Sequence, residues 1–174
     1  MSKQLSTADE AACRVPPPLD LGTFRDAMSS FPTGVTIVTT VDESGVAHGL
    51  TASSFCSVSL RPPLVSVCVA TSANCFPSFA RCDHFAVSIL RPHHVPLARR
   101  FADKSLDKFA AGGFRRGQLG LPVAEDALTV VECRVHDRHP AGDHTIVVGE
   151  VLTAYTGQGS PLLFVRRSFT EVAG

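Results

Sequence analysis

The sequence predicts a mainly β protein, an antiparallel barrel that carries only a few short helices. Short runs rich in Val, Ile, Thr and Phe recur along the chain, and Gly, Pro, Asp and Ser separate them. Helical patterns are few and brief, so an alternating array of strands and helices around a parallel sheet is not expected. The 174 residues suit one domain that buries a substantial core.

The N-terminal part is expected to hold a tail and one helix. Residues 1–20, with Pro16-Pro17-Pro18, predict a flexible tail that ends in a stiff spacer, which leaves 21–174 as the folded domain. Thr23 is the candidate cap of a helix that residues 32–34 bring to an end. Apolar residues at helical spacing indicate this helix: Phe24, Ala27, Met28 and Phe31.

The rest of the chain reads as strands with two short helices between them. β-Branched and apolar runs predict strands at 35–41, 46–51, 64–70, 85–90, 128–137, 145–155 and 162–166. Helices are expected at 76–81 and 95–102. The glycine-rich stretch 112–122, with Arg115 and Arg116, is expected to be a loop, and 139–144 is expected to join the two longest strands.

Composition narrows the class of protein and its compartment. Sixteen basic and sixteen acidic residues balance, so bulk charge favours neither nucleic acid nor an anionic membrane as a partner. No apolar stretch approaches the ~20 residues of a membrane-spanning helix, and residues 1–18 lack the pattern of a signal peptide. Six cysteines without CxxC spacing indicate reduced thiols, so the sequence predicts a cytoplasmic protein.

Several common functional motifs are absent from the sequence. Neither G-x-G-x-x-G nor G-x-x-x-x-G-K-[ST] occurs, so a nucleotide cofactor would bind without a Rossmann or P-loop cradle. A G-x-S-x-G elbow and an H-E-x-x-H are also missing, which argues against a hydrolase or a metalloprotease. No metal site is expected, because Cys75, Cys82 and His84 lack the usual ligand spacing.

A stretch rich in hydroxyl groups, residues 51–59, is the strongest candidate for a binding surface. Thr51, Ser53, Ser57 and Ser59 share one parity of this segment, so an extended chain would place them on one face. Hydroxyls and backbone amides suit a ligand with many acceptor atoms, such as a phosphate, a ribityl chain or the edge of a flavin ring. On spacing alone, an exposed edge strand rich in Ser and Thr explains the pattern at least as well.

A series of short motifs gives the chain a family resemblance. In chain order they are FPTGVTIVTT (31–40), HGLTASSF (48–55), SVSLRPPLV (57–65), FAVSIL (85–90), LARRFA (97–102), DKF (107–109) and GDH (142–144). In this order, over about residues 24–169, they closely resemble the short-chain flavin reductase family. Members of that family are small NAD(P)H:flavin oxidoreductases that feed reduced flavin to two-component monooxygenases.

The resemblance implies a Greek-key-like split β-barrel that binds FMN or FAD, uses NADH or NADPH, and forms a homodimer whose interface borders the flavin site. It also implies a monooxygenase partner that receives the reduced flavin. The matching His144 is the implied catalytic residue, which positions or polarises the nicotinamide carboxamide. The implied cofactor-binding residues are Thr33, Gly34, Thr51, Ala52, Ser53, Ser54, Phe55, Ser57, Ser59, Asn74, Ser105, Lys108 and Phe109.

The chain departs from the family pattern at three places. Ser88 stands where the family usually has Asn, and Arg167 stands where it usually has Gly, so local packing and the exit of the last strand are in question. Asn74-Cys75 replaces a common Ser/Thr pair, which touches the expected phosphate side of the cofactor. None of the three removes His144 or the hydroxyl-rich stretch.

Other interpretations of the same residues stay open at this point. A protein of this fold can retain its flavin and act directly on an organic metabolite, or can bind flavin without catalysis. Without the resemblance, His144 is an ordinary turn histidine. Lys108, with Ser105 and Asp107, would then be an exposed cluster at the end of a helix.

Overall fold

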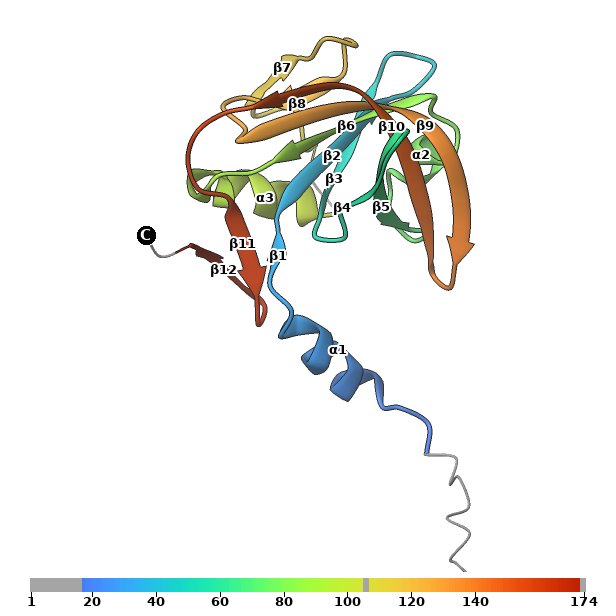
Figure 1. Ribbon diagram of the computed structural model, residues 1–174, viewed down its shortest axis with the longest axis vertical. Helices are drawn as coiled ribbons and strands as arrows, with labels where there is room; N and C mark the ends of the chain where they lie inside the picture. Colours follow the sequence, from blue (N-terminus) through green and yellow to red (C-terminus); the bar gives the residue numbers. More distant parts are fainter. Residues whose placement is uncertain (1–16, 105–106, 173–174) are drawn as a thin grey trace, which may run out of the picture.

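A computed structural model describes residues 17–104 and 107–172, and its centre is one strongly curved antiparallel sheet (Figure 1). Seven strands lie in the order β3-β2-β6-β9-β10-β5-β4. Their bounds are β2 Thr36–Val41, β3 Ala47–Ala52, β4 Cys56–Leu60, β5 Pro63–Ala70, β6 His84–Ile89, β9 Thr129–Ala141 and β10 His144–Thr156. The predicted mainly β architecture is therefore confirmed, since every pairing in this sheet is antiparallel.

The sheet closes on itself where its two edges meet. β3 and β4 are the edge strands, yet only residues 53–55 separate them in the sequence, and β3 contacts β5 across the seam. Ser54 fastens this link to β5, because its hydroxyl donates to the Cys68 carbonyl at 3.3 Å and accepts from the Cys68 amide at 3.0 Å. The link between β3 and β4 is thus a structural joint of the barrel.

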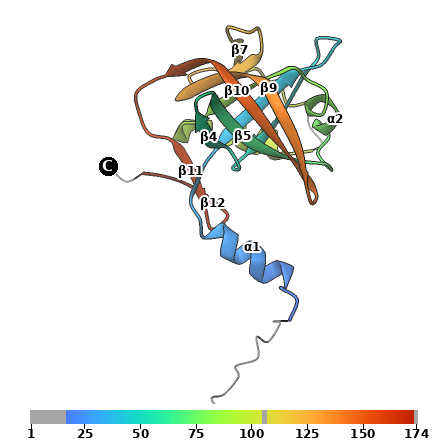
Figure 2. The ribbon, with the colours of Figure 1, turned by 45° about the vertical axis from the view of Figure 1, so that its right-hand side comes forward.

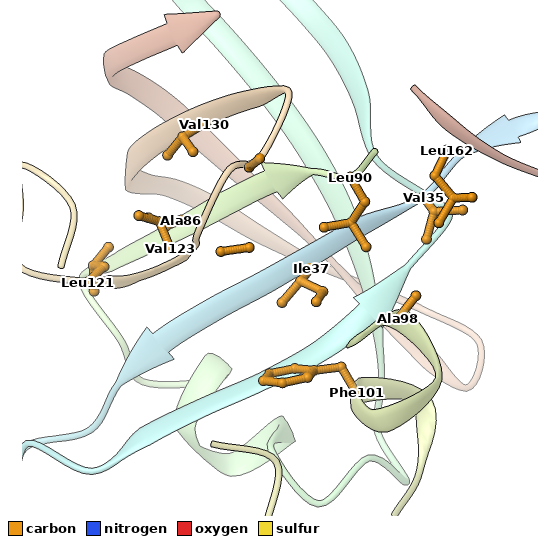
Figure 3. Packing of buried hydrophobic residues seen from close by; sticks show 12 residues of the cluster. Val35, Ile37, Ala86, Leu90, Ala98, Phe101, Leu121, Val123, Val130 and Leu162 are labelled. Carbon is orange, nitrogen blue, oxygen red and sulfur yellow. The ribbon is translucent and has the colours of Figure 1, made fainter. Parts of the chain in front are cut away.

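Two apolar clusters fill the molecule. One gathers Ile37, Leu90, Val123 and Leu162 with Phe101 from α3 (Val95–Ala102), as Figure 3 shows. Phe101 is 1% exposed, and burying such a ring contributes roughly 1.5–3 kcal/mol. The second cluster includes Val67, Val69, Phe85 and Val147, with Phe79 from α2 (Phe76–Phe79). Each helix therefore packs a phenylalanine against one of the two clusters.

Two close approaches in this core depend on glycine. A Cβ at Gly49 would lie 2.9 Å from the Phe101 ring and 3.0 Å from the Val38 carbonyl oxygen. A Cβ at Gly149 would collide with the buried Phe85 ring. Gly149 also lies at a register shift between β9 and β10. Because Gly149 has no side chain, β10 can pass close to the Phe85 ring at this point.

Smaller elements surround the barrel. A three-stranded sheet joins β1 (Thr33–Gly34), β11 (Leu162–Val165) and β12 (Ser168–Glu171), and a hairpin joins β7 (Phe114–Arg116) to β8 (Pro122–Ala124). A short 3-10 helix, η1 (Pro92–His94), precedes α3. The helix α1 (Leu21–Ser29) stands away from the barrel in both views (Figures 1 and 2) and buries none of its residues within the described chain.

The structure corrects three of the predicted elements. Asp20, not Thr23, caps α1, because the Asp20 carboxylate accepts from the Thr23 amide at 2.8 Å and leaves Thr23 as a donor. The predicted loop at 112–122 contains β7 and the start of β8, since Phe114 packs against the core and draws the chain into an extended pair. The predicted loop at 139–144 is a tight turn at Gly142-Asp143, because β9 and β10 pair up to that point. Of the predicted 1–20 tail, residues 1–16 lie outside the described residues.

The two departures at Ser88 and Arg167 have clear structural settings. Ser88 is fully buried, and its hydroxyl accepts a hydrogen bond from the Ala124 amide at 3.0 Å, so β6 and β8 remain joined. Arg166 and Arg167 form the turn between β11 and β12 with φ angles of 47° and 62°, a conformation that favours glycine. Both contact α1: the Arg166 amide donates to the Ser29 carbonyl, and Arg167 pairs with Asp26 at 2.8 Å.

Candidate functional site

The hydroxyl-rich stretch does not form one continuous strand. β3 ends at Ala52, residues 53–55 cross the barrel seam, and β4 begins at Cys56 on the opposite edge of the sheet. A bulge between Ser57 and Ser59 changes the pairing register again within β4. The prediction that one parity places four hydroxyls on one face is therefore wrong, because the chain turns in the middle of the segment.

The individual hydroxyls of this stretch have different surroundings. Thr51 donates to the Ala98 carbonyl of α3 at 2.6 Å, and Ser54 is bonded to the Cys68 backbone, so both stabilise the fold. Ser53 and Ser57 are exposed, and the Ser59 hydroxyl accepts from the Arg61 amide at 3.2 Å. The hydroxyls most free to meet a ligand are thus those of Ser53 and Ser57.

Three separate segments converge on a hollow of about 180 Å³. β3 contributes His48 and Gly49, and the turn before α2 contributes Asn74 and Cys75. The segment after α3 contributes Lys104, Asp107, Lys108 and Phe109. This hollow brings together three of the sequence-predicted cofactor residues: Asn74, Lys108 and Phe109. It is the candidate functional site because these predicted residues meet there with two lysines.

Lys108 lies at the inner wall of the hollow. Its ammonium donates to the Phe101 carbonyl at 2.8 Å and to the Gly49 carbonyl at 3.2 Å. Burial lowers the pKa of this ammonium from its usual value, and the Phe101 ring lies 5.9 Å away. Two of its three donors are therefore occupied by the backbone, which fixes the cation in place.

Asn74 and Cys75 form the outer lip of the same hollow. The Asn74 amide group donates to the Lys104 carbonyl at 2.8 Å, so it ties the turn before α2 to the segment after α3. Cys75 is 6% exposed, and burial raises the pKa of its thiol. The Cys75 side chain consequently behaves as a small neutral group there, whereas Asn74 supplies the polarity.

His144 lies outside the hollow, at the first position of β10 next to the hairpin turn. Its Nδ1 is 2.7 Å from a carboxylate oxygen of Asp143, and this hydrogen bond holds the pKa of Asp143 below its usual value. The Asp143 carbonyl accepts from the amide and hydroxyl of Thr71, which follows β5. Residues 71–74 thus connect the His144 turn to the lip of the hollow.

The structure separates the remaining predicted residues from this hollow. Thr33 and Gly34 pair with β11 in the small sheet, Ala52 is buried, and Phe55 packs on the second core cluster. Ser105 lies outside the described residues. His48 opens the HGLTASSF motif of the resemblance but is not among the predicted site residues, because its contact with Asp42, 2.8 Å from Nε2, becomes visible only in the structure.

Two absences hold for the described ranges, 17–104 and 107–172. No helix there is long and apolar enough to cross a membrane. No three His, Cys, Asp or Glu side chains there gather closely enough to hold a metal ion.

Known proteins resemble this chain in both sequence and structure. Residues 28–173 match the family model described as "Flavin reductase like domain". A protein of Streptomyces coelicolor called actinorhodin polyketide dimerase is 54% identical over 154 residues, covering 88% of this chain and 87% of its own. NADH:riboflavin 5'-phosphate oxidoreductase of Streptomyces pristinaespiralis is 42% identical, covering 84% and 85%.

Solved structures agree with the sequence relatives. The NADH:FAD oxidoreductase SgcE6 of Streptomyces globisporus, solved with NAD and FAD fragments, superposes with a TM-score of 0.85 at 37% identity, covering 92% of this chain and 98% of that one. The flavin reductase PheA2 gives a TM-score of 0.83 at 37% identity, covering 90% and 100%. These neighbours confirm the predicted split barrel. The chain belongs to the flavin reductase like domain family.

Proposed function

We propose that this chain is an NAD(P)H:flavin oxidoreductase that supplies reduced FMN or FAD to a separate monooxygenase. The observation that carries the proposal is the match, over 84% of this chain, to an NADH:riboflavin 5'-phosphate oxidoreductase. Another relative, 34% identical over 157 residues, is the reductase subunit HsaB of a flavin-dependent monooxygenase in Mycobacterium tuberculosis. The first name describes transfer of electrons between NADH and a flavin, and the second describes the reductase part of a monooxygenase.

The hollow fits the phosphate end of a flavin. Lys108, Lys104 and Asn74 offer two cations and an amide around a space of about 180 Å³, which is smaller than a pocket for a whole cofactor, roughly 300 Å³ or more. The ring system would then lie outside the hollow, toward Ser53, Ser57 and the His144 turn. A bound flavin accepts a hydride from a nicotinamide, and the protein contributes binding and orientation.

One experiment separates the candidate functions. Absorbance of the purified protein reports bound flavin, and oxidation of NADH or NADPH is then followed with and without added FMN or FAD. Colourless protein with turnover that depends on added flavin supports the proposal. Bound flavin without turnover of free flavin supports an enzyme that retains its cofactor, and flavin binding without any turnover indicates a carrier protein.

The second candidate, direct action on an organic metabolite, has one specific observation in its favour. The relative with 54% identity bears the name of a polyketide dimerase, which describes a reaction on a polyketide rather than on a free flavin. Under this alternative, a polyketide substrate would be consumed by the purified chain with NADH and flavin alone. Under the leading proposal, the same substrate is consumed only after a monooxygenase is added.

Replacing Ser57 by Leu is expected to weaken FMN binding by about tenfold or more. Ser57 is exposed on β4, so a bulky side chain there obstructs the surface without entering the core. Ser168→Leu is a matched control, since Ser168 is an exposed serine on β12. Fluorescence titration measures both affinities, and an unchanged affinity for Ser57→Leu, with circular dichroism like that of wild type, contradicts a flavin surface at β4.

We further propose a homodimer whose interface includes α1 and borders the flavin site. Leu21, Phe24 and Met28 expose 70%, 47% and 56% of their surface although they lie at helical spacing on α1. The Arg167–Asp26 pair and the Arg166–Ser29 hydrogen bond hold α1 in its outward position. A second copy can cover this apolar face, which removes the cost of exposing it to water.

Replacing Phe24 by Glu is expected to lower the dimer affinity by at least about tenfold, since a charge would be buried in an apolar contact. Arg25→Ala, on the same exposed helix, is the matched control. Sedimentation velocity over a range of concentrations measures the monomer fraction. A wild-type monomer at micromolar concentration that retains flavin reductase activity would refute the homodimer.

The proposal also includes a cytoplasmic location and a single folded domain. The five described cysteines are free thiols, which supports a reducing compartment and hence the cytoplasm. The family match over residues 28–173 supports a single flavin reductase domain over 21–174.

A further inference from the structure

His48 occupies a rigid position beside the hollow because its partner is itself fixed. One carboxylate oxygen of Asp42 accepts from the amides of Ser44 and Val46, both at 2.9 Å. The other oxygen lies 2.8 Å from Nε2 of His48. The hydrogen bond from His48 holds the pKa of Asp42 below its usual value, so the carboxylate is ionised and only accepts. Nε2 of His48 therefore carries a proton.

This geometry leaves Nδ1 as the variable atom of the ring. In the neutral ring Nδ1 accepts hydrogen bonds, and in the protonated ring it donates one. His48 lines the hollow, and its side chain is 27% exposed. Protonation of His48 thus changes this wall of the hollow from an acceptor to a donor.

The charge of the wall changes at the same time. With a neutral imidazole, the Asp42–His48 pair carries one negative charge, and with a protonated imidazole it carries none. Among the other residues that line the hollow, Lys104 and Lys108 supply positive charge and Asp107 supplies negative charge. An anion in the hollow is therefore held more tightly when His48 is protonated, and by linkage a bound anion favours the protonated form.

The size of the hollow selects a compact anion. Its volume of about 180 Å³ is below the roughly 300 Å³ at which pockets for small molecules begin. Lysine ammonium groups and a protonated imidazole are donors that suit phosphate oxygens. A phosphate group fits this description, whereas a three-ring system needs a larger space.

We propose that His48, oriented by Asp42, is a proton-controlled ligand for a phosphate ester bound in the hollow beside Lys104 and Lys108. The inference rests on the proposed flavin reductase function and extends it by assigning His48 as a ligand of the phosphate whose protonation controls binding. The ester can belong to the flavin or to the nicotinamide dinucleotide. Phosphate affinity is then higher when His48 is protonated than when it is neutral.

Other titratable groups face His48 from each neighbouring segment. Asp42 follows β2, Cys75 precedes α2, and Lys104, Asp107 and Lys108 follow α3. Burial raises the pKa of Cys75, which keeps it a neutral thiol, and histidine is the side chain that ordinarily changes charge between about pH 5 and pH 8. Burial also lowers the pKa of Lys108, so a variant that lacks the imidazole is needed to isolate the contribution of His48.

The test compares FMN with riboflavin, which lacks the phosphate, at about pH 6.5 and about pH 8.5. In wild-type protein, the ratio of the two affinities is expected to favour FMN more strongly at the lower pH. In His48→Gln the protein's part of this pH dependence disappears. Free FMN also titrates at its phosphate, and it does so identically in both experiments, so the difference between the two proteins reports His48 and its coupling to the bound phosphate. His139→Gln is the matched control, since His139 pairs with Asp137 at 3.2 Å on the surface of β9.

Each outcome bears on a distinct claim. Equal affinity of wild type for FMN and riboflavin, together with equal affinity for NADPH and NADH, overturns the phosphate site. A phosphate preference whose pH dependence survives in His48→Gln overturns the role of His48, although flavin reduction still stands. A preference confined to NADPH over NADH, lost in His48→Gln, supports the site and assigns the ester to the nicotinamide side.

A probe without flavin separates this inference from the proposed function. Inorganic phosphate is added to the protein while nuclear magnetic resonance follows the His48 ring, and its titration midpoint is expected to rise. A midpoint that stays constant contradicts the phosphate site even if the protein reduces flavin. A midpoint that rises supports the site even if flavin-dependent oxidation of NADH is absent.

Discussion

Replacing His144 by Ala is expected to slow nicotinamide-driven flavin reduction by roughly 10- to 100-fold, while flavin affinity changes by no more than about twofold. The loss corresponds to one positioning hydrogen bond, about 1–3 kcal/mol in the transition state. The expectation rests on the proposed function, in which His144 orients the nicotinamide carboxamide and does not hold the flavin.

The structure explains why His144 can orient a group. Its Nδ1 is bonded to Asp143 at 2.7 Å, which directs the other ring nitrogen away from the carboxylate. The backbone of Asp143 is in turn fixed by the amide and hydroxyl of Thr71. A ring held at one nitrogen presents the other in a constant direction, and orientation of this kind is what hydride transfer requires of a protein.

Stopped-flow measurement of flavin reduction distinguishes this role from a structural one. The rate at saturating nicotinamide is compared with the affinity for FMN, measured separately by fluorescence. His136→Ala is the matched control, because His136 is an exposed histidine on the neighbouring strand β9. A His144→Ala rate equal to that of wild type would exclude the positioning role.

The sequence was a good guide to strands whose side chains alternate or cluster within one segment. β2, β3, β5, β6 and α3 lie within a residue or so of their predicted bounds. β2, β5 and β6 bury runs of residues that are visible locally, and α3 buries Ala98 and Phe101 at helical spacing. The short hairpin of β7 and β8 was missed, since its pairing depends on contacts with Ser88 and Glu132 from distant strands. Local patterns cannot report such partners.

The candidate site could also be predicted only in part. Asn74, Lys108 and Phe109 were predicted from family motifs and do converge in one hollow. The prediction that hydroxyls of residues 51–59 share one face is wrong, because residues 53–55 carry the chain across the barrel seam. His48 was overlooked, since its significance arises from Asp42, a residue that reads from sequence as part of an ordinary turn.

Replacing Glu132 by Ala is expected to lower the free energy of unfolding by about 3 kcal/mol, because it removes a buried carboxylate that holds a loop. Glu132 is 1% exposed on β9. Its two oxygens accept from the amides of Gln118 at 2.6 Å and Leu119 at 2.9 Å, and one also accepts from the Thr153 hydroxyl at 3.3 Å. Removal leaves these three partly buried donors without their shared acceptor.

A second substitution tests the same contact from the other side. A Cβ at Gly117 would lie 2.5 Å from the Glu132 carboxylate, so Gly117→Ala is expected to displace the loop and reproduce part of the loss. Glu125→Ala is the matched control, because Glu125 is exposed and its removal is expected to change stability by less than about 0.5 kcal/mol. Urea unfolding without flavin, at one protein concentration, measures all three variants. If Glu132→Ala unfolds at the same urea concentration as Glu125→Ala, the buried carboxylate does not hold the loop, and packing of β7 and β8 on the barrel suffices.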